Sequence, residues 1–204
     1  MERDEEKRII DRVLAGDAQA FEALVLENQT QVYNLALRMV NNEQDACDIA
    51  QDAFIRAYRS LGNFRGESKF SVWLYRLTSN ICLDFLRAQR RSRTISLSYT
   101  PPDEDESTEL NIPDERFAPH TQLEQKELRA ELQQALGQLP PEQREILLLR
   151  EISGLSYDEI ARSLTLEPGT VKSRIFRARK KLCNILMKDR NFSSFPSSNR
   201  AKGV

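Results

Sequence analysis

The chain has 204 residues, of which 40% are hydrophobic and 30% are charged, so it is long enough for one domain or two small ones with packed cores. Its formal net charge of -1 identifies no class of partner, and its 3 distant cysteines and 1 histidine exclude a disulfide framework and the usual zinc sites. No apolar run approaches the ~18 residues of a membrane span, and no signal peptide opens the chain. We expect a cytoplasmic protein with reduced thiols, without membrane insertion, cofactor or bound metal.

Apolar residues recur with the helical period along nearly the whole chain, and we predict an all-α fold. We expect two small helical domains, at residues 1–93 and 121–188, with a helix-turn-helix in the second. An acidic flexible linker at residues 94–120 would join them, because seven acids and no base lie between residues 101 and 115. Residues 189–204 follow no pattern, and we expect a disordered tail.

The first domain is predicted to begin with a short helix that ends at Gly16. Asp17 then caps a longer helix, which Asn41 and Asn42 close. A third helix follows and ends near Leu61, with apolar residues at i, i+1, i+4 and i+5 spacing. Its predicted buried residues are Ile49, Ala50, Ala53, Phe54, Ala57, Tyr58 and Leu61.

The opposite face of the third helix carries Asp48, Gln51, Asp52 and Ile55. One interpretation is a solvated face, and another is a docking site for a basic partner helix with Ile55 at its apolar centre. A third is a divalent-metal site, in which Asp45, Asp48 and Asp52 supply oxygen ligands. No second acidic cluster completes that ligand shell.

Next comes a loop at residues 63–70 with a glycine, two aromatic and two basic residues, a composition typical of ligand-binding loops. It leads into a helix at about residues 71–91 that presents a tryptophan, an amide and arginines on one side. Such a face can stack unpaired bases and bind their phosphates; alternatively, Trp73 is a half-buried residue at the edge of the core. The candidate residues are Phe64, Arg65, Ser68, Lys69, Trp73, Arg76, Asn80 and Arg87.

We place His120 in the linker, without a role. Thr121 and Glu124 have capping-box spacing and predict the start of a helix. Pro140 and Pro141 restart the chain as a second helix, and Gly154 ends that segment. The predicted inward residues of these two helices are Leu128, Leu132, Ala135, Leu136, Ile146, Leu147, Leu149 and Ile152.

The helix-turn-helix prediction rests on residues 155–182. Ser156 and Glu159 have capping-box spacing, a short turn follows at residues 165–167, and Pro168 suits the first position of a second helix. The second helix carries many basic residues and no acid, so a solvated face is the weaker interpretation and DNA phosphate the favoured partner. We assign base-edge or nearby phosphate contacts to Thr170, Lys172, Ser173 and Arg174, and phosphate positioning to Arg177, Arg179 and Lys180.

Several ordered stretches together resemble a bacterial RNA polymerase sigma factor of the extracytoplasmic-function (ECF) type. They are residues 48–58 (DIAQDAFIRAY), 64–68 (FRGES), 73–76 (WLYR), Leu139-Pro140, and residues 169–174 (GTVKSR) with 177–179 (RAR). The likeness covers roughly residues 5 to 188, without the linker and tail.

The resemblance implies a dissociable specificity subunit without enzymatic activity. The face with Asp48, Gln51, Asp52 and Ile55 would meet a coiled coil of the largest subunit of core RNA polymerase, whose flap is a second expected contact. The loop at residues 63–70 and the adjacent helix face would hold the opened -10 promoter element as a single strand. The second helix of the helix-turn-helix would read the -35 element as duplex.

Two alternatives stay open at this point. A self-sufficient helix-turn-helix regulator would dimerise on symmetric half-sites, but it leaves the first domain without a role. A metal-dependent nuclease would use Asp45, Asp48 and Asp52. Many relatives of the family bind an anti-sigma factor, so such a partner is possible here, although no stretch of this chain identifies its surface.

Overall fold

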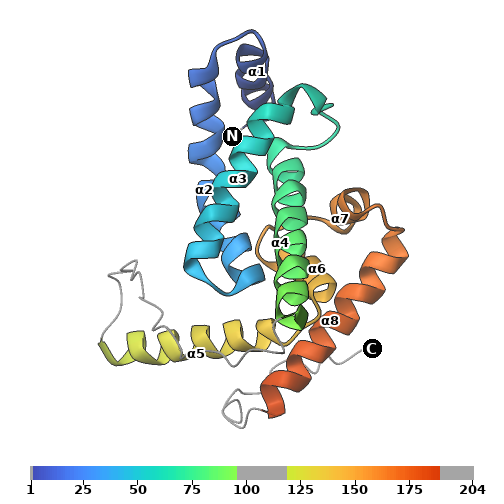
Figure 1. Cartoon of the computed structure of the whole chain (residues 1–204). Helices are drawn as coiled ribbons and strands as arrows, with labels where there is room; N and C mark the ends of the chain where they lie inside the picture. Colours follow the sequence, from blue (N-terminus) through green and yellow to red (C-terminus); the bar gives the residue numbers. More distant parts are fainter. Residues whose placement is uncertain (1, 96–118, 189–204) are drawn as a thin grey trace.

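The computed structural model describes residues 2–95 and 119–188, and within these ranges every regular element is helical (Figure 1). The all-α prediction is confirmed for this part of the chain. None of the described helices combines the length and hydrophobicity that a membrane span requires. The α-helices are α1 (Arg3–Leu14), α2 (Phe21–Val40), α3 (Glu43–Ser60), α4 (Phe70–Ile95), α5 (Pro119–Gly137), α6 (Pro141–Glu151), α7 (Tyr157–Leu164) and α8 (Pro168–Lys188).

Short polar side chains define the helix boundaries of the first unit, α1–α4. The Asp17 carboxylate accepts a hydrogen bond of 3.2 Å from the Ala20 backbone N–H. It caps a 3-10 turn at residues 18–20, which runs into α2, rather than the α-helix itself. Asn41 ends α2 in the left-handed region at φ 60°, and the Asn42 side chain accepts from the Asp45 N–H to start α3. Local capping therefore sets these boundaries.

The core of the first unit lies between α2, α3 and α4. Its aromatic centre is Phe70, whose ring packs edge-on against Phe21 with 6.3 Å between ring centroids. Tyr58, which we predicted to be buried, is 45% exposed, so that prediction was wrong. The rings of Tyr58 and Phe21 pack edge to face with 5.2 Å between their centroids. Much of the Tyr58 side chain nevertheless stays in solvent, as is common for amphipathic aromatic residues.

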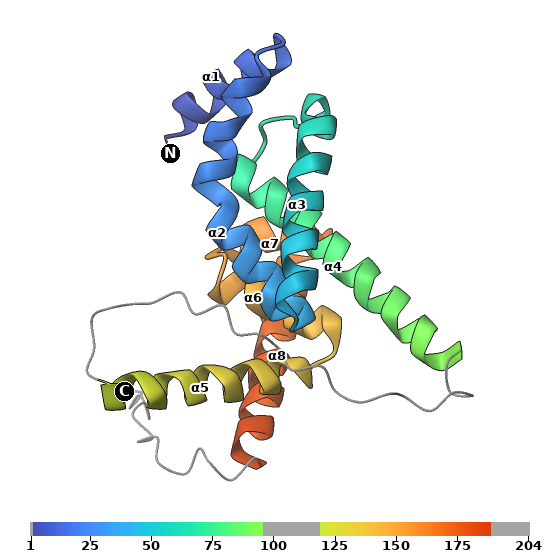
Figure 2. The ribbon, with the colours of Figure 1, turned by 60° about the vertical axis from the view of Figure 1, so that its left-hand side comes forward.

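The second unit, α5–α8, packs directly against the first (Figure 1 and Figure 2). Helix α6 contacts α7 and α8 of its own unit and also α2 and α4 of the first unit. Every residue from Arg144 to Leu149 is consequently buried. The prediction of Ile152 as an inward residue was wrong: it follows the last residue of α6 and is 37% exposed.

The helix ends near the predicted linker differ slightly from expectation. Helix α4 continues to Ile95, and α5 begins at Pro119, a residue that is favourable at the first helical position. His120, which we placed in the linker, therefore lies in the first turn of α5. The remaining linker residues, 96–118, and the tail at 189–204 lie outside the described residues, as do the side chains of Thr121 and Glu124.

One carboxyl group is buried where the two units meet. Glu145 of α6 is buried near Cys82 of α4. The Glu145 pKa is raised from 4.5 to about 7, chiefly by burial and also by the nearby Glu142 carboxylate, whereas Arg87 opposes the shift. The same burial raises the pKa of the Cys82 thiol to about 12. The packed state therefore favours a protonated Glu145.

We predict that Glu145→Gln stabilises the protein at pH 8 but hardly at pH 4. Below the unfolded pKa of 4.5 the carboxyl is neutral in both states, and above the folded pKa of about 7 the packed state must bury a charge. The variant should therefore gain about 1–3 kcal/mol in unfolding free energy at pH 8. Urea unfolding at both pH values measures this, with Glu22→Gln at an exposed position of α2 as control. An equal gain at both pH values would contradict the explanation.

Candidate nucleic-acid interfaces

The helix-turn-helix begins with the predicted capping box. The Ser156 hydroxyl accepts from the Glu159 backbone N–H at 3.2 Å, and the Glu159 carboxylate accepts from the Ser156 N–H at 2.8 Å. Both helix-start N–H groups are thus satisfied. On the inward face of α7, Ile160 and Ala161 are buried as predicted, and Leu164 is partly buried.

The turn between α7 and α8 falls at the predicted residues. Thr165 adopts the left-handed conformation at φ 54°, and the Leu166 N–H donates to the Ala161 carbonyl at 2.8 Å. Pro168 then opens α8, and the Thr170 and Val171 N–H groups donate to the Glu167 carbonyl. After this turn, α8 packs its buried side against α5, α6 and α7.

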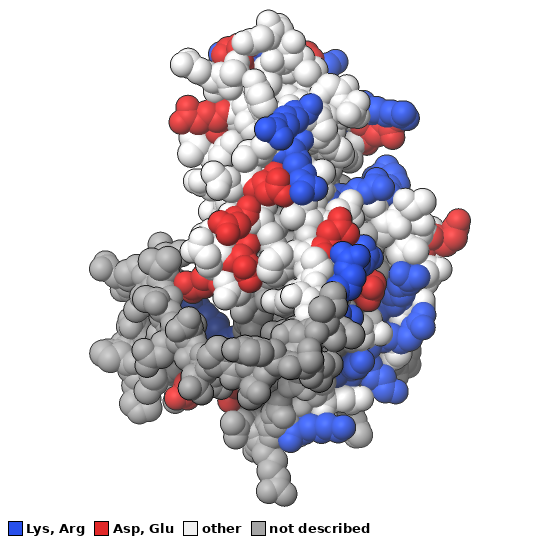
Figure 3. Space-filling view, in the orientation of Figure 1, with Lys and Arg blue, Asp and Glu red and all other residues white. Residues whose placement is uncertain are grey.

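Helix α8 presents a continuous basic surface. Val171, Ile175 and Ala178 are buried on one side. Thr170 is partly buried, and the other residues that we assigned to duplex DNA are exposed (Figure 3). The exposed set is Lys172, Ser173, Arg174, Arg177, Arg179 and Lys180.

Two arginines on this surface already have partners. Arg177 donates to the Ser173 hydroxyl at 3.3 Å, and Arg179 pairs with Glu151 of α6, with its Nε at 3.1 Å from a carboxylate oxygen. Exposed ion pairs contribute only about 0–1 kcal/mol, so a phosphate could replace Glu151. The sequence reasoning missed Phe176, which is 67% exposed among these residues and offers an apolar contact to bases. Its position one residue after the inward Ile175 was the available signal.

The loop before α4 is held in place by an aromatic cluster. Phe64 lies 5.4 Å from Trp73 and 6.0 Å from Phe70 between ring centroids, and Phe70 lies 5.7 Å from Trp73. Trp73 is thus partly buried against the core, as one interpretation expected, yet it still lines an open cavity. Gly66 allows the loop to turn, with φ at 68°.

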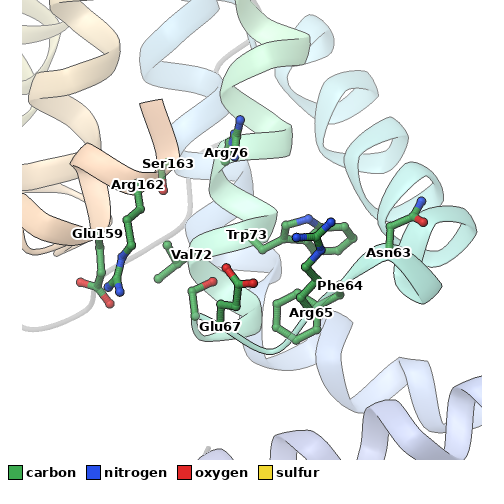
Figure 4. A pocket seen from close by; sticks show the side chains of 11 residues that line it. Asn63, Phe64, Arg65, Glu67, Val72, Trp73, Arg76, Glu159, Arg162 and Ser163 are labelled. Carbon is green, nitrogen blue, oxygen red and sulfur yellow. The ribbon is translucent and has the colours of Figure 1, made fainter. Parts of the chain in front are cut away.

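The cavity at this loop has a volume of about 250 Å³. That is below the ~300–1,000 Å³ of pockets for drug-sized ligands and suits a smaller group such as a single base. Five of the predicted single-strand residues line it: Phe64, Arg65, Ser68, Trp73 and Arg76. Glu159, Arg162 and Ser163 of α7 close its other side (Figure 4).

The other three predicted single-strand residues do not line the cavity. Lys69 is exposed in the loop just before α4, and Asn80 is exposed further along α4. Arg87 lies two turns beyond Asn80 and donates to Asp84 at 3.1 Å. The structure therefore brings most of this predicted set together but separates Arg87 from it.

The outer face of α3 is acidic with an apolar centre, as expected. Asp48, Gln51 and Ile55 are exposed, and Asp52 pairs with Arg56 at 2.8 Å. Figure 3 shows acidic side chains gathered over α3, while basic side chains follow α8.

Residues of α4 that the sequence reasoning missed extend this acidic face. Asp84 and Phe85 join α3 side chains around a groove of about 420 Å³. No local signal relates residues that are this far apart in the sequence, because only the packing of α4 on α3 brings them together.

The three acids of the nuclease hypothesis do not assemble a metal site in this part of the chain. Asp52 is paired with Arg56, and burial together with the Asp48 charge raises the Asp45 pKa. Among the described residues, no group of three or more histidine, cysteine, aspartate or glutamate side chains is arranged to hold a metal ion.

Comparison with known proteins relates both units to one family. Residues 24–92 match sigma-70 region 2, and residues 129–182 match sigma-70 region 4. The chain is 40% identical over 185 residues to the RNA polymerase sigma-H factor of Pseudomonas aeruginosa, covering 87% of this chain and 92% of that protein. It is 39% identical over 176 residues to the ECF RNA polymerase sigma-E factor of Escherichia coli K12, covering 86% and 91%.

A solved structure shares the fold. The sigma factor RpoE of Bartonella quintana, in complex with the anti-sigma factor NepR, superposes with a TM-score of 0.63 at 25% identity, over 83% of this chain and 98% of that one. The matches to both regions and the coverage of the relatives agree with the order of motifs along the sequence. The chain therefore belongs to the ECF group of the sigma-70 family of RNA polymerase sigma factors.

Proposed function

We propose that this protein is a dissociable subunit that binds core RNA polymerase in the cytoplasm, directs it to specific promoters and initiates transcription, without catalytic activity of its own. The observation that carries the proposal is that one chain matches both sigma-70 regions, with a cavity lined by aromatic and basic residues beside α4 and with exposed basic residues along α8. A self-sufficient dimeric regulator would leave the region 2 unit without a role and is not favoured.

Core polymerase binds the outer face of α3 in this proposal. Asp48, Gln51 and Ile55 are exposed there, and Asp52 lies beside them with its charge shared by Arg56. An acidic surface around an apolar centre complements a basic amphipathic helix, such as one strand of the coiled coil in the largest polymerase subunit. The flap of the polymerase would contact the second unit.

The cavity beside Trp73 receives an unstacked base of the -10 element. Aromatic side chains stack bases, and arginines such as Arg65 and Arg76 bind the neighbouring phosphates. Extracting the base costs a few kcal/mol, which these contacts offset. The basic surface of α8 binds the -35 element in the major groove, with Arg174 near base edges and Lys180 near phosphate. An anti-sigma factor is a possible further partner, as for the RpoE relative.

Reversing the charge of Asp52 should block assembly with core polymerase. A lysine there places like charges opposite each other, which costs several kcal/mol, so we expect the affinity for core to fall at least tenfold. Asp52→Lys should leave -35 duplex binding unchanged. Fluorescence anisotropy of the labelled protein with core and with duplex measures both affinities.

Two controls accompany this experiment. Asp11→Lys makes the same change on the exposed side of α1 and should leave core binding intact. Asp52→Asn separates loss of the Arg56 ion pair from charge reversal. Core binding by Asp52→Lys that is as tight as core binding by Asp11→Lys would contradict the assigned surface.

Removing the Arg174 side chain should weaken -35 recognition by about 1–3 kcal/mol, because a good base contact is worth that much. Binding of Arg174→Ala to promoter duplex and to a duplex with a scrambled -35 element tests this. Arg129→Ala, an exposed arginine on α5, is the matched control. An affinity equal to that of Arg129→Ala on both duplexes would remove Arg174 from the recognition surface.

A further inference from the structure

The first helix contacts the loop before α4 although the two are far apart in the sequence. Arg3 of α1 donates through Nη2 to the Gly66 carbonyl at 2.8 Å. The Glu6 carboxylate accepts from the Phe70 backbone N–H at 2.9 Å. Helix α1 also contacts the 3-10 turn Leu61–Asn63, where this loop begins. The loop is therefore held by α1 at its start, its middle and its end (Figure 1).

Glu6 supplies a cap that the sequence just before α4 lacks. The first N–H groups of a helix have no intrahelical partner, and a Ser, Thr, Asp or Asn side chain at the cap position usually accepts from one of them. Lys69 occupies that position, and an ammonium group can only donate. The Ser68 hydroxyl donates to the Lys69 carbonyl at 3.2 Å. A carboxylate is favourable at the positive end of a helix, so Glu6 takes the role of the cap from 64 positions away.

The Arg3 contact falls at the bend of the loop. Gly66 has a φ of 68°, a conformation that glycine adopts more readily than other residues. Its carbonyl is the acceptor for Arg3, so this hydrogen bond fixes the peptide group at the bend. Arg65 and Ser68, on either side of Gly66, line the cavity. The described lining includes neither Arg3 nor Glu6, so α1 acts on the cavity only through the loop.

Helix α1 is itself fixed to the core of the first unit. Ile10 and Val13 are buried in that core, near the end of the helix that lies away from Arg3 and Glu6. The match to sigma-70 region 2 begins at residue 24, after α1. That match therefore gives the helix no role, whereas its two polar contacts connect it to the loop.

We propose that Arg3 and Glu6 are positioning residues for the -10 element, because they hold the loop at residues 63–70 in the form that shapes the cavity beside Trp73. This inference rests on the proposed function, since it takes the cavity as the site of the unstacked base. A preformed site avoids the cost of ordering the loop when the strand binds. When the loop is ordered in only a fraction of the molecules, the apparent dissociation constant rises in inverse proportion to that fraction.

Electrostatics alone predicts the opposite effect for Glu6. Removing an acid lowers the repulsion of DNA phosphate, so neutralisation by itself should tighten strand binding, whereas loss of positioning should weaken it. Glu6→Ala removes the acceptor of the Phe70 N–H. Glu6→Gln is equally neutral but keeps a side-chain carbonyl that can accept the same hydrogen bond. Glu5→Ala removes a carboxylate from an exposed neighbour in α1 and is the matched control.

A second pair of variants tests the contact at the bend. Arg3→Ala removes the donor to the Gly66 carbonyl. Arg8→Ala is its control, because both side chains are exposed arginines of α1. An exposed position contributes nothing to the core, so Arg3→Ala keeps the test decisive even if Glu6→Ala destabilises the protein.

Trp73 provides a direct readout of the loop. It is the single tryptophan of the chain, and its ring lies 5.4 Å from that of Phe64 between centroids. Quenching of its fluorescence by acrylamide in the full-length protein therefore reports whether the loop stays packed on it. The second readout is the affinity of holoenzyme, assembled from core polymerase and each variant, for a short fluorescein-labelled single strand with a mapped -10 sequence. A -35 duplex is the reference, because α8 binds it without the loop.

We expect Glu6→Ala and Arg3→Ala to increase quenching of Trp73 and to weaken strand binding by the holoenzyme about fivefold, with -35 duplex affinity unchanged. Glu6→Gln, Glu5→Ala and Arg8→Ala should keep the quenching of the wild-type protein and should not show this loss. Wild-type behaviour of Glu6→Ala and Arg3→Ala would overturn the proposal, as would increased quenching without weaker strand binding. Equal weakening by Glu6→Ala and Glu6→Gln would also contradict it, because the hydrogen bond would then not be the cause.

The two proposals fail in different ways. If core polymerase with the wild-type protein binds no -10 strand, the proposed function fails, while the Trp73 quenching series still decides whether α1 orders the loop. If the wild-type holoenzyme binds the strand and initiates from promoters but Glu6→Ala and Arg3→Ala match their controls, the sigma function stands and the positioning role is wrong.

Discussion

The burial of Arg144 between the two helical units is the constraint on which the rest of the structure depends. A guanidinium has five N–H donors and cannot lose its charge at physiological pH, so burying it requires acceptors. The carbonyls of Gly137, Leu139 and Met39 supply them from both units. Burial lowers the Arg144 pKa, and the Arg90 charge lowers it further, so burying this charge between the units has an electrostatic cost that the three carbonyls offset. Separating the units would remove the Met39 carbonyl from this guanidinium, whose buried Nε has no hydrogen-bond partner among the described residues in the packed state.

This central position of α6 explains where the functional surfaces lie. Because α6 is enclosed by helices of both units, the exposed chemistry is carried by the outer faces of α3, α4 and α8. Acidic residues gather on α3 and basic residues on α8, so each of these two surfaces carries mainly one sign of charge. The net charge of -1 therefore does not indicate the class of partner. The two signs serve different partners in the proposed function: a basic protein helix for α3 and DNA for α8.

Features with local causes could be predicted from the sequence. The Ser156–Glu159 capping box, the turn at residues 165–167 and the role of Pro168 depend on residues a few positions apart, and each was found where expected. The wrong predictions involve tertiary packing: Tyr58 and Ile152 continue an apolar pattern but lie where other elements cover them only in part. The contribution of Asp84 to the acidic face and of α7 to the cavity depends on contacts between distant segments, as do the hydrogen bonds of Arg144 to both units, and periodicity does not encode such contacts.

The central claim is that this chain confers promoter specificity on RNA polymerase. The most direct measurement is run-off transcription from a pool of genomic promoter fragments by purified core polymerase, with and without the protein. Defined start sites should appear only when the protein is added, and upstream of them the fragments should share -10 and -35 sequences. Duplex binding by the protein with no new start sites in the presence of core would contradict the claim and favour a self-sufficient regulator.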